Sequence, residues 1–209
     1  MLVGGMLVTV DVYSSLSRKA LAYFTATYGE QSSHRLTEWQ DTIDGAAHLS
    51  EKARALEANA YFNQYEWKSD LEHWGKRDYW ATPFEMIGTN AGDCEDYCIG
   101  KYFMLAELSV AREKLLMTYV RAPRLRETHM VLAYYPSRNA DPYILDNLTS
   151  EVRRGSERLD LIPVYSFNAD GLWKAVQRRR GRRVGGANQL KMWRRVVDKM
   201  KAEGYDTGS

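Results

Sequence analysis

Cysteine is scarce in this chain, and long apolar runs are missing. Only two of the 209 residues are cysteines, Cys94 and Cys98. Their spacing of four does not fit the widely spaced, even set of a disulfide scaffold. No stretch of the sequence is long and apolar enough to cross a bilayer, and neither internal repeats nor low-complexity tracts occur. These absences exclude a disulfide-stabilised miniprotein, an integral membrane protein and a repeat array.

The composition is that of a folded protein. Hydrophobic residues make up 44% of the chain, aromatic residues 12% and charged residues of mixed sign 27%. The mean hydropathy is -0.51. A chain of this length and composition can bury one good hydrophobic core, so we expect a globular protein with one main domain.

The two ends of the sequence differ from its middle. We predict an N-terminal segment at residues 1–32, a main domain at 33–175 and a basic helical extension at 176–209. The first ten residues are apolar but lack the basic start and cleavage site of a complete signal peptide. They are either a buried first segment or the tail of an export signal. Residues 174–201 hold eleven Lys or Arg residues and one acidic residue, Asp198. We interpret this block as a solvated helix face, and expect no nucleic-acid partner and no membrane insertion.

Hydrophobic periodicity predicts a mixture of helices and strands. Residues 33–62 have helical spacing that Gly45 weakens midway, and residues 63–92 read as an irregular, ordered connection. A second helix follows from Cys94 to Leu108. The other expected elements are strands at residues 115–120, 129–135 and 143–148, and a last helix at 188–203 with Asn188 as its N-cap. The turn-rich segment 136–142 predicts an antiparallel pair between the last two strands.

Cys94 has the surroundings of a nucleophile. The Gly92-Asp93 turn leads directly into the helix, which aims free backbone N–H groups at the sulfur. A thiolate is the reactive form of cysteine, and such a position beside a histidine lowers a thiol pKa to roughly 3.5–7.5. The competing interpretation is a packing role, which is the more frequent one for a cysteine in a buried helix. Cys98, four residues on, we assign to the core.

His129 and Asp146 are the expected partners of the thiol. His129 opens one predicted strand and Asp146 lies on the next, so pairing about residues 136–142 can make them neighbours. A general base needs a third group that holds its tautomer and orientation, and Asp146 fits that role. The alternatives are a core histidine and an aspartate that caps a turn.

Three carboxylates crowd the predicted nucleophile. Asp93, Glu95 and Asp96 raise the thiol pKa, which is unfavourable where a thiolate is needed. Hard oxygen ligands this close together suit Ca²⁺, with backbone carbonyls and water completing six to eight ligands. However, no twelve-residue calcium-loop pattern is present, and acidic residues also favour the N-terminal helix dipole by about 0.3–1 kcal/mol each. From these residues alone the dipole interpretation is favoured.

Several blocks occur together in one order and carry a resemblance to a known family. They are Trp74-Gly, Asp78-Tyr-Trp-Ala-Thr-Pro83, Gly92-Asp-Cys-Glu-Asp-Tyr97, Lys101-Tyr-Phe103, His129-Met-Val-Leu-Ala-Tyr-Tyr135, Leu145-Asp-Asn-Leu148 and Pro163-Val-Tyr-Ser-Phe-Asn168. In this combination, from about residue 36 to 173, the sequence resembles the bacterial transglutaminase-like cysteine proteases. The resemblance implies an α+β, papain-like fold: a central helix bearing the nucleophile, packed on an antiparallel sheet, with flanking helices.

The resemblance also implies residue roles. Cys94, His129 and Asp146 fall on the family's catalytic triad. The family depends on Ca²⁺ near the nucleophile, and its acidic ligands carry over to Asp93 and Glu95, and with them Asp96. Cys98 departs from the pattern, since a small residue such as alanine is expected there.

The implied biology is that of a periplasmic protease. Such an enzyme cuts the N-terminal region of a large surface adhesin at a di-alanine site and so releases cells from a biofilm. The periplasmic domain of an inner-membrane cyclic di-GMP receptor captures the protease and restrains it. Substrate, receptor partner and periplasmic location are therefore expectations drawn from the resemblance.

Three other readings stay open. The same triad can pass its acyl group to an amine, as in a transglutaminase-like acyltransferase. A calcium-gated protein-binding module with a silent triad is a second alternative. A zinc site built from Cys94, Cys98 and His129 is the third, but it lacks a fourth ligand and a usual spacing.

Overall fold

The computed structural model describes residues 17–123, 127–174 and 181–205. Its larger helices are α1 (Arg18–Tyr28), α2 (Glu30–Ala46), α3 (Glu51–Phe62), α4 (Asp70–Trp74), α5 (Pro83–Thr89), α6 (Cys94–Glu107) and α7 (Lys191–Ala202). The strands are β1 (Glu66–Trp67), β2 (Ala91–Gly92), β3 (Leu115–Ala122), β4 (Glu127–Tyr134), β5 (Tyr143–Leu145), β6 (Arg153–Arg154), β7 (Ile162–Asn168), β8 (Gly171–Lys174) and β9 (Arg183–Gly185). Short 3₁₀ turns occupy Arg112–Lys114, Gly155–Glu157 and Ala187–Gln189.

The first predicted helix is two helices. The break falls at residues 47–50, between α2 and α3, so Gly45 lies inside the last turn of α2. Ser50 begins the second helix, because its side chain accepts a hydrogen bond from the amide of Ala53 at 3.3 Å. The break was predicted at Gly45, and it begins two residues later, at residue 47.

The sheet is antiparallel and has seven strands in the order β6-β5-β4-β3-β7-β8-β9. The predicted hairpin is confirmed: β4 and β5 pair with Leu132 opposite Leu145. Alternate residues of β3 and β4 point to opposite faces. One face joins the main core through Met117 and Leu132, and the other forms a second apolar cluster that includes Val131.

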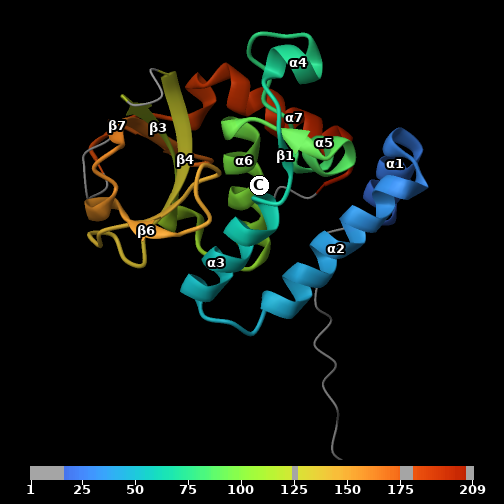
Figure 1. Cartoon of the computed structure of the whole chain (residues 1–209), viewed down its shortest axis with the longest axis horizontal. Coiled ribbons are helices and arrows are strands. Elements are labelled where there is room, and N and C mark those ends of the chain that lie inside the picture. Colours follow the sequence, from blue (N-terminus) through green and yellow to red (C-terminus); the bar gives the residue numbers. More distant parts are fainter. Residues whose placement is uncertain (1–16, 124–126, 175–180, 206–209) are drawn as a thin grey trace, which may run out of the picture.

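Helix α6 lies in the middle of the molecule, between the sheet and the other helices (Figure 1). It packs against β3 and β4 on one side and against α3 and α5 on the other. The predicted apolar character on both faces is confirmed, since the side chains from Tyr97 to Leu105 are buried. A Cβ at Gly100 would overlap the ring of Phe62, so only glycine lets α3 approach this closely.

The predicted fold class is confirmed: helices pack against an antiparallel sheet. Phe24 of α1 and Trp193 and Met200 of α7 belong to the same core cluster as α6. Helix α7 begins at Lys191, after Leu190, so Asn188 is not its N-cap. The division at residue 33 stays a prediction, and the boundary at 175–176 lies outside the described residues. Within the described ranges, no helix has the length and apolarity needed to cross a membrane.

Candidate active site

Two very short strands place Cys94 at the start of α6. β1 and β2 pair in parallel, with Trp67 opposite Gly92, and the amide of Lys68 donates to Gly92 O at 3.0 Å. Asp93 is the N-cap of α6, and its amide donates to Asp96 Oδ2 at 3.2 Å. A Cβ at Gly92 would come within 2.8 Å of the Asp96 Cβ, so glycine is required directly before this turn.

The thiol of Cys94 is held in a crowded, negatively charged setting. Its Sγ donates to Glu95 Oε2 at 2.7 Å. Burial, followed by the charges of Glu95 and Asp93, raises the pKa of Cys94, while the backbone amide of Met130 acts in the opposite direction. Met130 follows His129 on β4, which places the predicted nucleophile beside the strand that carries the predicted base.

The structure brings His129 and Asp146 together. His129 Nε2 lies 2.7 Å from Asp146 Oδ1, and both side chains are buried. Asp146 follows the last residue of β5, and its Oδ1 also accepts from the Leu148 amide at 3.0 Å. Because Asp146 takes the Nε2 side of the ring, Nδ1 is the nitrogen left to exchange a proton with a thiol.

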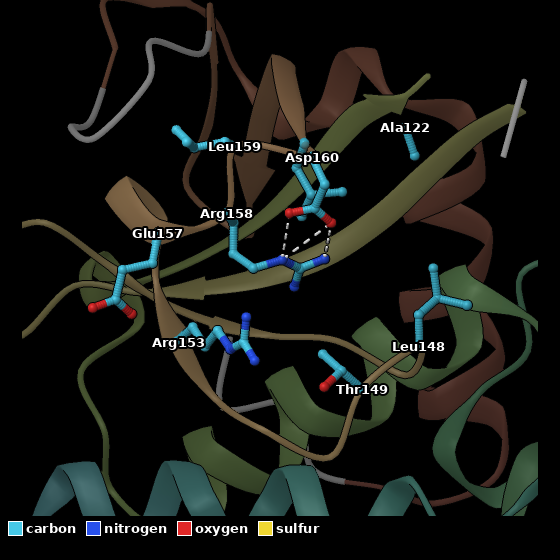
Figure 2. A pocket seen from close by; sticks show the side chains of 9 residues that line it. Ala122, Leu148, Thr149, Arg153, Glu157, Arg158, Leu159 and Asp160 are labelled. Atoms are coloured by element: carbon cyan, nitrogen blue, oxygen red, sulfur yellow. Dashed lines mark hydrogen bonds and ion pairs between the residues drawn. The ribbon is translucent and has the colours of Figure 1, made fainter. Parts of the chain in front are cut away.

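Arg158 is a site residue that the sequence analysis missed. Its Nη2 donates to Asp146 Oδ2 at 2.8 Å, and its Nε and Nη2 also bind Asp160. Figure 2 shows this Arg158–Asp160 pair at the edge of a pocket of about 460 Å³. Burial raises the pKa of Asp146, but His129, Leu148 and Arg158 outweigh it and lower the pKa to about 2. Asp146 therefore stays ionised while it orients His129.

An acidic cluster adjoins Cys94, the predicted nucleophile. Asp70, Asp93 and Asp96 each offer an oxygen atom, and these atoms lie within 4.8 Å of one another. Asp70 was not predicted: the β1–β2 pair brings the residues that follow the two strands together, and two-residue strands leave no readable pattern. The carboxylate of Glu95 instead lies with Asp93 and Cys94 in a neighbouring group. The role of Glu95 as a metal ligand stays a prediction.

The cluster fits a hard divalent cation. Asp70 Oδ1 and Asp93 Oδ1 are both buried, and neither accepts a hydrogen bond from the part of the chain that the structure describes. Burial and then the charges of Glu95, Asp96 and Asp70 raise the pKa of Asp93 to about 10. Buried, unpaired carboxylate oxygens are costly without a counter-charge, and oxygen-only ligands suit Ca²⁺. Asp70, Asp93 and Asp96 could hold such an ion.

We expect Ca²⁺ to stabilise the fold through this cluster. At a free concentration about 100 times its dissociation constant, an ion that binds only the folded state adds about 2.7 kcal/mol to the free energy of unfolding. Asp70→Asn should reduce this gain, because it removes one charged ligand. Chemical unfolding with Ca²⁺ and with a chelator measures it. Asp41→Asn on α2 is the control with the same charge change at an exposed position, and equal gains in both variants would contradict the assignment.

The zinc alternative finds no support in the described ranges. Cys98 is 2% exposed and belongs to the core cluster, as predicted. In these ranges, neither Cys98 nor His129 belongs to a group of side chains that could hold a metal ion. The two cysteines are free.

A cysteine at a helix N-terminus, next to a strand that carries a histidine paired with a buried aspartate, is typical of cysteine hydrolases. Residues 27–180 match the family described as bacterial transglutaminase-like cysteine proteinase. The chain belongs to this family, and its class of activity is that of a cysteine peptidase.

Solved structures of LapG from Legionella pneumophila are similar to this chain. The EGTA-treated form has 36% sequence identity and a TM-score of 0.78, and covers 88% of this chain and 98% of its own. The calcium-bound form has 35% identity and a TM-score of 0.76, and covers 88% and 99%. No curated protein sequence matches the chain. The chain is thus a LapG-like cysteine proteinase, and a structural relative binds calcium.

Proposed function

We propose that this protein is a calcium-dependent periplasmic endopeptidase that cuts the N-terminal region of a large surface adhesin at a di-alanine site. The observation that carries the proposal is the buried pair of His129, on the strand beside Cys94, and Asp146, at the end of the next strand, in a chain of this proteinase family. Control by the periplasmic domain of an inner-membrane cyclic di-GMP receptor belongs to the same proposal.

The proposed reaction uses three side chains. His129 Nδ1 takes the proton of the Cys94 thiol, and the sulfur attacks the peptide carbonyl carbon. The oxyanion forms near the free backbone N–H groups at the start of α6. The C–N bond breaks as His129 returns the proton to the leaving amine, which leaves a thioester on Cys94. His129 then takes a proton from water, whose oxygen attacks the thioester; the C–S bond breaks, the acid leaves, and the proton on His129 returns to the Cys94 sulfur. Asp146 keeps the imidazole oriented and stabilises its charged form.

In this proposal, the role of calcium is to balance the negative charge around the Cys94 thiol. Held by Asp70, Asp93 and Asp96, with Glu95 as the further predicted ligand, it would offset the carboxylates that oppose ionisation of the nearby thiol. The calcium-bound form of LapG supports this choice of ion.

A cleavage assay tests the function. An adhesin N-terminal fragment with one di-alanine site is incubated with the protein, with Ca²⁺ or with a chelator, and the products are weighed by mass spectrometry. We expect one cut at the di-alanine site in Ca²⁺ and a loss of rate of at least about a hundredfold in the chelator, a size seen when electrostatic support at a site is removed. A fragment with a bulky residue in place of either alanine is the substrate control.

Other outcomes favour the other readings. Incorporation of an added amine without hydrolysis would support a transglutaminase-like acyltransferase. No cut in any condition, together with tight binding of the receptor's periplasmic domain, would support a calcium-gated binding module. Cutting at full rate in the chelator would remove Ca²⁺ from the mechanism.

A further inference from the structure

A groove lies between the loop after α4 and the last helix. Its volume is about 490 Å³, within the range of about 300–1,000 Å³ that is usual for ligand sites. Segment 76–80 forms one wall and one face of α7 forms the other. Lys199 joins the two walls, because its Nζ donates to Trp80 O at 2.8 Å and pairs with Glu85.

The lining combines an apolar floor with charges of both signs. Tyr79, Trp80 and Met192 supply apolar surface. At the rim, Lys76 and Arg195 have no carboxylate partner among the described residues. Asp78 and Asp198 supply acidic groups at the same groove. Apolar surface edged by both charges suits a stretch of polypeptide with an apolar side chain at its centre.

The groove is linked to Cys94 through packed side chains of the same core cluster. Trp80 packs against Tyr119, with ring centroids 6.3 Å apart. Tyr119 is paired across the sheet with Met130. The backbone amide of Met130 lies at the Cys94 sulfur, where it favours the thiolate. Three successive contacts thus separate the groove from Cys94, and since one extended residue spans about 3.3 Å, a substrate segment of a few residues is long enough to bridge them.

The acidic cluster holds one wall of the groove. The amide of Tyr79 donates to Asp70 Oδ2 at 2.5 Å, and the amide of Ala81 donates to Asp96 Oδ1 at 2.6 Å. These two hydrogen bonds tie the position of segment 79–81 to the two carboxylates. An ion held by the cluster would fix the wall as well as act on the thiol.

We propose that this groove is a substrate subsite for an apolar side chain close to the scissile bond, with a wall that the cation cluster positions. The inference rests on the proposed endopeptidase activity and names a specificity element for it.

Two variants of one residue test the subsite. Met192→Asp puts a charge into the apolar floor, at the second position of α7 where an acidic residue favours the helix. Met192→Leu keeps the floor apolar. We expect Met192→Asp to raise KM about tenfold at nearly unchanged kcat, the size of one lost apolar contact, and Met192→Leu to behave as wild type. Wild-type KM for Met192→Asp would overturn the proposal, as would loss of receptor binding in that variant with unaltered cleavage.

A binding measurement separates this proposal from the protease function. A fluorescently labelled adhesin fragment is titrated onto the Cys94→Ala chain, which needs no turnover, with Ca²⁺ or with a chelator. We expect about tenfold weaker binding for Cys94→Ala/Met192→Asp than for Cys94→Ala, and weaker binding of both in the chelator. If the wild type cuts no substrate and binding still depends on Met192, the proposed protease function is refuted and the subsite is supported. If cutting occurs and binding does not depend on Met192, only the subsite proposal is refuted.

Discussion

Cys94→Ala should lower kcat/KM for the adhesin fragment by at least about a thousandfold. Covalent catalysis is lost, and only substrate binding and the N–H groups at the start of α6 remain to stabilise the transition state. The fold should survive, because the side chain is only partly buried and loses a single atom. Initial rates with the fragment, together with thermal unfolding, measure both effects.

Cys98→Ala is the matched control. It makes the same change one helical turn further on, at a residue that is 2% exposed. We expect near wild-type kcat/KM and a loss of stability of about 1 kcal/mol from the small cavity. If Cys98→Ala abolished cleavage while Cys94→Ala retained it, the nucleophile would be misassigned.

Asp146→Ala should lower kcat by about a thousandfold with little change in KM. His129 loses the acceptor at Nε2 that sets its orientation, and its charged form loses a partner during the reaction. The substitution should also destabilise the fold by about 3 kcal/mol, since it leaves Arg158 buried with one carboxylate fewer. Kinetics and denaturant unfolding report the two effects.

Asp160→Ala is the control for that variant. It removes the other partner of Arg158, at a side chain that is 40% exposed, and leaves the Asp146–Arg158 ion pair intact. We expect kcat within about threefold of wild type, because an exposed ion pair contributes at most about 1 kcal/mol. Equal losses in Asp146→Ala and Asp160→Ala would assign the effect to packing around Arg158.

The contribution of Asp146 to the free energy of unfolding should depend on pH. Its folded-state pKa is about 2 against an ordinary 3.8, a difference that corresponds to roughly 2 kcal/mol. Because the folded pKa is the lower one, this contribution is complete above about pH 4 and is lost as the pH falls through about 2. The gap in unfolding free energy between wild type and Asp146→Ala should therefore narrow over that range. A constant gap would contradict the assignment.

Elements with strong local patterns were predictable from the sequence. Helix α6 was predicted because its apolar run starts directly after the Gly92-Asp93 turn. The β4–β5 pair was predicted because a turn-rich segment of seven residues separates two apolar runs. The meeting of His129 and Asp146 followed from that pairing alone. The resemblance to the protease family covered the same residues and led to the same fold.

The remaining site residues depend on contacts that no local pattern encodes. Asp70 joins Asp93 only because strands of two residues pair across 25 positions. Arg158 follows a short 3₁₀ turn in a segment without periodicity, and reaches Asp146 with a long side chain. The groove arises where α7 meets a loop more than a hundred residues earlier, so neither segment reveals it by itself.

The glycines around α6 limit how this sequence can vary in evolution. At Gly92 and Gly100 there is no space for even one more carbon atom, because Asp96 and Phe62 occupy it. Gly45 has nothing within 4 Å of the same position and lies in an ordinary helical turn. Relatives that keep this site must therefore keep glycine two residues before Cys94 and six residues after it, while position 45 can change.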